Sequence, residues 1–131
     1  MFYLSTTTEY GLNLLIILGR NQDRMSLRQV AIQGHMPYRF LTKIVKQLMQ
    51  AKLIQAKEGK NGGYSLLKDP KGIKVKTIFE ALGESLSLTL CISAKHCPMG
   101  VEKQCKMRPI WLNIKKAIDK ELSQTTLADL I

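Results

Sequence analysis

The sequence has no long apolar run and no secretory signal, and both absences narrow its possible functions. Its longest apolar stretch, residues 14–18, is far shorter than the roughly 18 residues that a membrane-spanning helix needs. The first residues lack the basic start of a secretory signal. We therefore expect a cytoplasmic protein with no membrane partner.

Catalytic signatures and paired cysteines are also missing. There is no Ser-His-Asp set, no pair of acid and base carboxylates and no phosphate-binding loop, so we do not expect an enzyme. Three cysteines do not suit a disulfide framework. The 131 residues, 45% of them hydrophobic, are enough for one domain with its own core.

Acidic residues are scarce in the first part of the chain. Residues 1–76 contain 13 Lys and Arg against 4 Asp and Glu, whereas residues 77–131 contain 7 against 6. Because phosphate neutralisation drives nucleic-acid affinity, this asymmetry indicates a polyanion-binding module followed by a segment with another task. A basic surface that only favours solubility is the plain alternative.

Three helical patterns come first. Residues 6–9 form a capping-box pattern, with Thr6 as the cap and Glu9 reaching back, and predict a helix to about Gly19. Residues 26–29 repeat the pattern and predict a short helix. Pro37 suits the first position of a third helix, in which an apolar stripe opposes a polar face. This order is typical of a helix-turn-helix.

A hairpin pattern and a long helical pattern follow. Residues 53–57 and 64–67 are strand-like around a glycine-rich turn, which predicts a wing. The last pattern, from residue 109 to about 122, has an apolar stripe that one helix cannot bury. It could fold back on the first module or pair with its copy in a homodimer, and we favour the homodimer. The stripe contains Trp111, Ile114, Ile118 and Leu122.

These patterns predict a fold that is mainly α with a small β-hairpin. Residues 1–76 would form a winged helix-turn-helix DNA-binding domain. Residues 77–131 would form a cysteine sensor loop and a dimerisation helix.

Four motifs make the chain similar to a known family. They are TEYGL at residues 8–12, GKNGGY at 59–64, the three-cysteine loop and TLADL at 126–130. In this order they resemble the bacterial winged-helix regulators of the IscR and NsrR family, which includes an iron–sulfur cluster regulator and a nitric-oxide-sensing repressor. The resemblance covers nearly the whole chain. It implies a homodimeric transcription regulator whose cluster alters binding to double-stranded operator DNA.

The predicted recognition helix and wing supply the candidate DNA contacts. Arg39 and Lys43 lie one turn apart on the polar face, where guanidinium and ammonium groups can pair with guanine edges. Tyr38 and Thr42 lie beside them, and Lys46 is expected to contact phosphate. The other candidates are Arg28 in the second helix and Lys57, Lys60 and Asn61 in the wing.

Cys91, Cys97 and Cys105 lie within 15 residues of each other and indicate metal or redox chemistry. The resemblance implies a [2Fe–2S] or [4Fe–4S] cluster. Zinc is the alternative metal, but structural zinc sites usually use pairs of cysteines with about two to four residues between them. Here five residues lie between the first two cysteines and seven between the second and the third. The cysteines could also form a metal-free thiol switch, or they could be incidental.

Three cysteines leave one position of a four-ligand cluster open. IscR has a ligand histidine where this chain has Arg108, and a guanidinium offers no lone pair. The choice is then Glu9, His96 or an exogenous molecule. Some relatives carry a similar acidic residue that acts as a ligand from the partner subunit, so the resemblance favours Glu9.

Two further function classes stay open at this point. A small basic iron–sulfur electron carrier would not need a helix-turn-helix with a glycine wing. A winged helix that binds RNA is the second, and binding to duplex DNA against an RNA competitor separates it from a DNA regulator.

Overall fold

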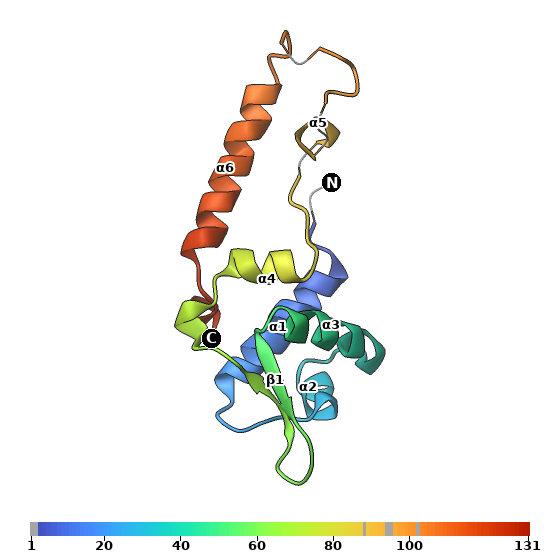
Figure 1. Ribbon diagram of the computed structural model, residues 1–131, viewed down its shortest axis with the longest axis vertical. Helices are drawn as coiled ribbons and strands as arrows, with labels where there is room; N and C mark the ends of the chain where they lie inside the picture. Colours follow the sequence, from blue (N-terminus) through green and yellow to red (C-terminus); the bar gives the residue numbers. More distant parts are fainter. Residues whose placement is uncertain (1–2, 88, 94–95, 102) are drawn as a thin grey trace.

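The computed structural model describes residues 3–87, 89–93, 96–101 and 103–131. The fold is mainly α with a two-stranded antiparallel hairpin, as predicted. Figure 1 shows the hairpin and the first helices at one end, with a long helix and a facing segment extending away from them. The elements are α1 (Thr6–Arg20), α2 (Leu27–Gln33), α3 (Tyr38–Gln50), β1 (Ile54–Lys57), β2 (Gly63–Leu66), the 3₁₀ helix η1 (Pro70–Gly72), α4 (Val75–Ala81), α5 (Leu90–Ser93), α6 (Arg108–Gln124) and the 3₁₀ helix η2 (Leu127–Leu130).

The cap of α1 differs from the prediction. The N-cap is Ser5, whose backbone is extended and whose hydroxyl accepts the Thr8 amide at 3.3 Å. The predicted capping box of Thr6 and Glu9 is therefore wrong, because Thr6 is already helical and only a residue outside the helix can cap it. The Glu9 carboxylate is exposed and has no hydrogen bond or ion pair within the described part of the chain.

Helices α2 and α3 form the predicted helix-turn-helix. The capping box of Ser26 and Gln29 is confirmed, with bonds of 2.8 and 3.2 Å. Pro37 is the N-cap of α3 and not its first helical residue. The buried stripe packs against α1 and α2. It consists of Leu41, Ile44, Val45 and Leu48.

The wing pairs β1 with β2 in antiparallel register, from Ile54 opposite Leu66 to Lys57 opposite Gly63. The backbone before α2 joins this hairpin, because Met25 and Tyr64 exchange two hydrogen bonds of 3.0 and 2.7 Å. Gly63 makes this approach possible. Its φ is +125°, and a Cβ atom there would lie 2.6 Å from the Met25 carbonyl oxygen.

The end of the chain returns to the first module. The Val75 amide donates to the Thr125 carbonyl at 2.9 Å, and the Leu127 amide donates to the Ile73 carbonyl at 2.8 Å. Leu127 is fully buried in the same core as the stripe of α3. The largest fully buried apolar side chains are Leu14, Leu15, Val30, Leu41, Ile44, Leu48, Leu53, Ile73, Ile78 and Leu127.

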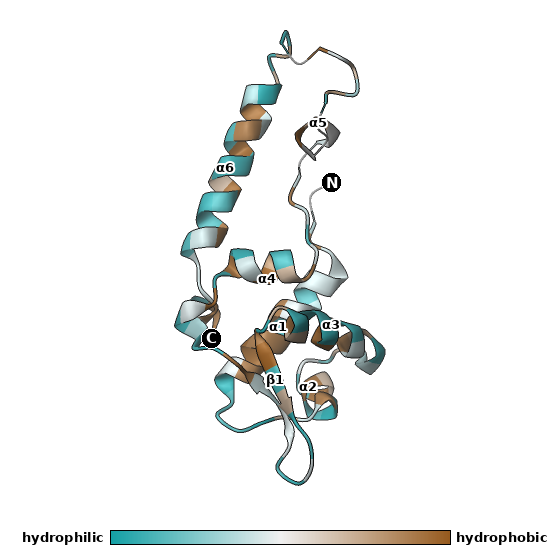
Figure 2. Ribbon diagram, viewed as in Figure 1, coloured by the Kyte–Doolittle hydropathy of each residue, from teal (hydrophilic) through white to brown (hydrophobic). Residues whose placement is uncertain are grey.

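Helix α6 is long and poorly covered by its own chain. It packs against α4 and α5, and no residue of it is buried. Figure 2 shows apolar residues distributed along it. Ile110 is 53% exposed and Ile114 is 38% exposed. Among the described residues, no helix combines the length and the apolar character needed to cross a bilayer.

Candidate nucleic-acid interface and cysteine segment

The polar face of α3 is open to solvent. Arg39 and Lys43 are exposed one turn apart, and the buried stripe on the opposite face holds the helix in place. The Thr42 hydroxyl donates to the Arg39 carbonyl at 2.8 Å, so its lone pairs stay available. Tyr38 and Lys46 are exposed at the two ends of this face.

Arg28 of α2 lies beside the start of α3. Its guanidinium carbon is 5.9 Å from the centre of the Tyr38 ring, which is within cation–π range. This contact links the first turns of the two helices. The exposed Ile32 lies next to it, in a small apolar hollow with Ala31.

The wing adds polar groups beside this face. Lys57, Lys60 and Asn61 are exposed, and Asn61 has a φ of +66°. Within the described residues, none of the cations on α2, α3 or the wing forms an ion pair, so their charges are free for an external anion. Figure 1 shows the wing extending past α2 at the end of the molecule that is opposite the tip of α6.

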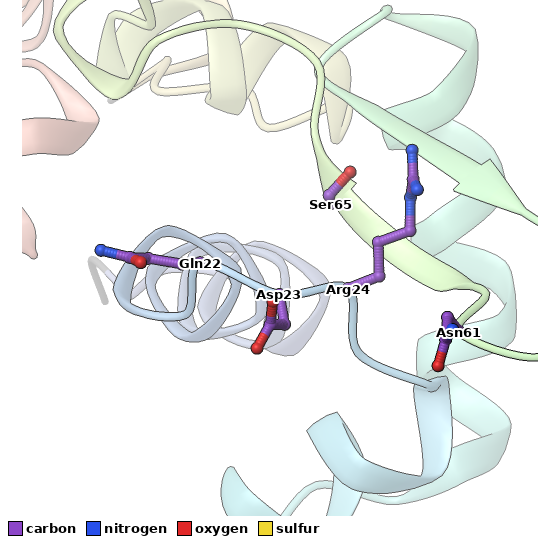
Figure 3. A pocket seen from close by; sticks show the side chains of 5 residues that line it. All are labelled: Gln22, Asp23, Arg24, Asn61 and Ser65. Atoms are coloured by element: carbon purple, nitrogen blue, oxygen red, sulfur yellow. The ribbon is translucent and has the colours of Figure 1, made fainter.

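The segment before α2 contributes polar residues beside the wing. Gln22, Asp23 and Arg24 meet Asn61 and Ser65 of the wing around a polar hollow of about 620 Å³ (Figure 3). No local pattern marks these residues. Their position depends on the backbone hydrogen bonds between Met25, the next residue in the chain, and Tyr64 of the wing.

The three cysteines lie on the segment between α4 and α6, and each is half-buried. Cys91 is in α5, with its sulfur 3.0 Å from the Thr89 hydroxyl oxygen. Cys97 and Cys105 lie outside the helices. His96 is exposed beside Cys97.

The structure does not gather these candidates into one site. Within the described residues, no three His, Cys, Asp or Glu side chains lie close enough to hold a metal ion. The thiol donors suit a cluster chemically, but their arrangement here does not bring them together. The Nε of Arg108, the first residue of α6, is shielded from solvent and has no hydrogen-bond partner in the described part of the chain.

Glu84 connects the start of this segment to α1. Its Oε2 atom accepts hydrogen bonds from the Ser5 amide, the Ser5 hydroxyl and the Thr8 hydroxyl, at 3.1, 2.6 and 2.5 Å. Burial raises the pKa of the Glu84 carboxyl, but these three hydrogen bonds outweigh burial and hold the pKa below its usual value. No local sequence pattern marks Glu84, because its partners Ser5 and Thr8 lie 79 and 76 positions earlier in the chain.

Comparison with known proteins identifies the family. The model of the Rrf2 family, described as iron-dependent transcriptional regulators, matches residues 4–131. The transcriptional regulator NsrR of Halalkalibacterium halodurans is 29% identical over 130 residues, which cover 98% of this chain and 89% of that protein.

Two solved structures share the fold over almost the whole chain. CymR, the global cysteine regulator of B. subtilis, matches with a TM-score of 0.79 and 28% identity, covering 99% of this chain and 96% of CymR. IscR of T. potens matches with a TM-score of 0.77 and 26% identity, covering 98% of this chain and 85% of IscR. The protein therefore belongs to the Rrf2 family, and it is a winged-helix transcription regulator that binds DNA, not an enzyme.

Proposed function

We propose that this protein is a cytoplasmic homodimer that binds operator DNA through α3 and the wing, under the control of an iron–sulfur cluster on its cysteine segment. The observation that carries the DNA-binding part is the exposed, unpaired polar face of α3 beside an equally exposed wing. A helix with such a face fits the major groove, where base edges carry a distinct code.

Each exposed group has a role in this proposal. Arg39 and Lys43 contact base edges, and Tyr38 and Thr42 lie beside them on the same helix. Lys46 contacts a phosphate. Arg28, which contacts the Tyr38 ring, binds the phosphate backbone of the DNA near the start of α2. From the wing, Lys57, Lys60 and Asn61 reach phosphates or the minor groove.

The dimer part of the proposal rests on α6. Its apolar stripe, which includes Ile114 and Ile118, is left partly exposed by the rest of the chain. A second copy of α6 across a twofold axis would cover it. Residues 1–76 would then be the DNA-binding unit, and residues 77–131 the sensor and dimerisation unit, with Leu127 anchoring the second to the first.

Cys91, Cys97 and Cys105 would hold the cluster in the sensor part. The support is the donor set and the relationship to IscR and NsrR. A bound cluster, [2Fe–2S] or [4Fe–4S], supplies a group that responds to oxidants, nitric oxide or iron supply. We propose Glu9 of the partner subunit as the fourth ligand, since its carboxylate is exposed and is not used as a cap.

A path from the cysteine segment to DNA runs through α1. Glu84, at the start of the segment, accepts the hydrogen bonds of Ser5 and Thr8 at the start of α1. Helix α1 packs in turn against α3. A rearrangement of the segment would therefore shift α1 and the recognition helix, which couples the two sites.

A cluster-free regulator is the second candidate. It is favoured by the separation of the thiols in this structure and by the relationship to CymR, a cysteine regulator. In this case the thiols themselves would be the sensor, or they would bind zinc.

The test is anaerobic purification of the full chain, followed by an absorption spectrum and by iron, sulfide and zinc counts. Brown protein with iron and sulfide, which loses both in Cys97→Ser, supports the cluster. Zinc alone or no metal supports the second candidate. DNA binding is tested separately by selecting duplexes from a random pool in the presence of an RNA competitor, and failure to enrich any duplex would contradict it.

A further inference from the structure

We propose that Arg24 contacts the minor groove beside each half-site and gives the regulator a preference for A·T-rich flanking DNA. This inference rests on the proposed DNA-binding function. It assigns a specificity role to a residue that lies outside both the recognition helix and the wing.

The first support is where Arg24 lies. The polar hollow has lining residues from two parts of the chain, Gln22 to Arg24 before α2, and Asn61 and Ser65 in the wing. The hydrogen bonds between Met25 and Tyr64 hold these two parts together. In Figure 3, the side chains of Arg24 and Ser65 project to the same side. Arg24 is thus a neighbour of the wing in space, although β2 begins 39 positions later in the chain.

The second support is that the Arg24 charge is unused. Arg24 is exposed, and within the described chain its guanidinium has no hydrogen bond or ion pair. Asp23 is the nearest acidic residue in the chain, but its carboxylate projects to the opposite side of the segment (Figure 3). Glu58 adds one acid in the wing, against the two cations Lys57 and Lys60. Arg24 therefore adds a free cation to a surface that already favours an anion.

The chemistry of arginine selects the minor groove of A·T-rich DNA. Runs of A·T pairs narrow this groove and strengthen its negative potential, which attracts arginine. Arginine is also more weakly hydrated than lysine, so it enters a narrow groove at lower cost. Because the neighbouring Met25 is hydrogen-bonded to Tyr64, the backbone beside Arg24 loses little conformational freedom when DNA binds.

The experiment uses the full chain and a duplex selected from a random pool. Four versions of this duplex differ only in the pairs that flank each half-site: A·T, G·C, inosine·C and diaminopurine·T. Inosine·C has the minor groove of A·T with the major groove of G·C, and diaminopurine·T has the reverse. We expect wild-type protein to bind the A·T and inosine·C versions at least about fivefold more tightly than the other two.

The variants Arg24→Lys and Arg24→Gln should both lose this preference. Arg24→Lys should keep the salt dependence of binding, whereas Arg24→Gln should reduce its slope by about one. Arg20→Lys is the matched control, because Arg20 is an exposed arginine at the end of α1 that does not line the hollow, and it should keep the preference. Thermal unfolding of each variant checks that the fold is retained.

Two outcomes would overturn the inference while the proposed function stands. One is wild-type protein that binds all four flanks equally. The other is an Arg24→Gln variant that is weaker on every flank by the same factor, since Arg24 would then contact only phosphates. If no duplex is selected at all, the proposed function fails and this inference fails with it.

Discussion

Ser5 and Glu84 are 79 positions apart, yet the Glu84 carboxylate accepts hydrogen bonds from both the amide and the hydroxyl of Ser5. The Ser5 hydroxyl also accepts the Thr8 amide, and Thr8 is the polar residue that the described core buries completely. The Glu84 carboxylate thus joins the start of α1 to the start of the cysteine segment through these hydrogen bonds. This junction is the connection that we expect a signal to use.

Glu84→Ala should lower the free energy of unfolding by about 2 kcal/mol, the value of a hydrogen bond to a charged group. Glu84→Gln should lower it less, because an amide oxygen still accepts. The pKa of Glu84 is lowered in the fold, so its stabilising effect is present above its unfolded value of about 4.5 and is lost as the pH falls through the folded value.

Urea unfolding at neutral pH and at about pH 4 measures this effect. The difference between wild type and Glu84→Gln should shrink at the lower pH. Glu80→Gln, on the exposed side of α4, is the control and should be nearly neutral. A difference that grows on acidification would contradict the hydrogen-bond assignment.

Arg39→Ala should cost about 1–3 kcal/mol of operator binding and relax the preference at one base pair, because Arg39 lies on the exposed face of α3. Lys60→Ala should weaken binding to all sequences alike. Titration of operator and random duplexes at one salt concentration separates the two effects. Equal losses on both duplexes for Arg39→Ala would refute base contact.

Polar substitution of Ile114 and Ile118 together should give a folded monomer with weak operator affinity. Ile114 is exposed, Ile118 is partly exposed and neither belongs to the buried core, so the substitution should remove an interface and leave the core of the monomer intact. Sedimentation at micromolar concentration measures the oligomeric state of the wild-type protein and the variant. A wild-type monomer that still binds its operator tightly would show that the dimer proposal is wrong.

The operator of a dimer should contain two half-sites about one or two helical turns apart.

Glu9→Ala should change the cluster spectrum and operator affinity of anaerobically reconstituted protein, whereas His96→Ala should change neither. The reason is that the Glu9 carboxylate is exposed and does not cap α1, while His96 adjoins Cys97, and neighbouring loop residues rarely bind one metal without strain. The reverse pattern would assign the ligand to His96. No effect of either variant would point to an exogenous ligand.

Gly63→Ala should destabilise the protein by about 1–3 kcal/mol, because the glycine has a positive φ and Met25 occupies the space of a side chain. Gly72→Ala is the control, since no atom lies within 4 Å of its Cβ position and its φ is not positive. Thermal unfolding measures both. Equal stabilities would show that the approach of Met25 to the wing is not tight in solution.

The sequence determined those parts of the fold that depend on neighbouring residues. The capping box of Ser26 and Gln29, the buried stripe of α3 and the antiparallel wing all follow from interactions within a few positions, or from a periodicity of one element. The same periodicity placed Arg39 and Lys43 on an exposed face. The four family motifs are likewise local, so the membership in a family of regulators was also predictable.

The tertiary structure alone decided the contacts between distant segments. Ser5 rather than Thr6 caps α1, because Glu84 holds the Ser5 hydroxyl beside the helix end. Leu127 joins the core of the first module because its amide pairs with the Ile73 carbonyl. Arg24 adjoins the wing because the next residue, Met25, pairs with Tyr64, and no local pattern encodes either pairing. The three cysteines are close in sequence but not gathered in space, since ligand geometry depends on the path of the chain between them and not on their spacing alone.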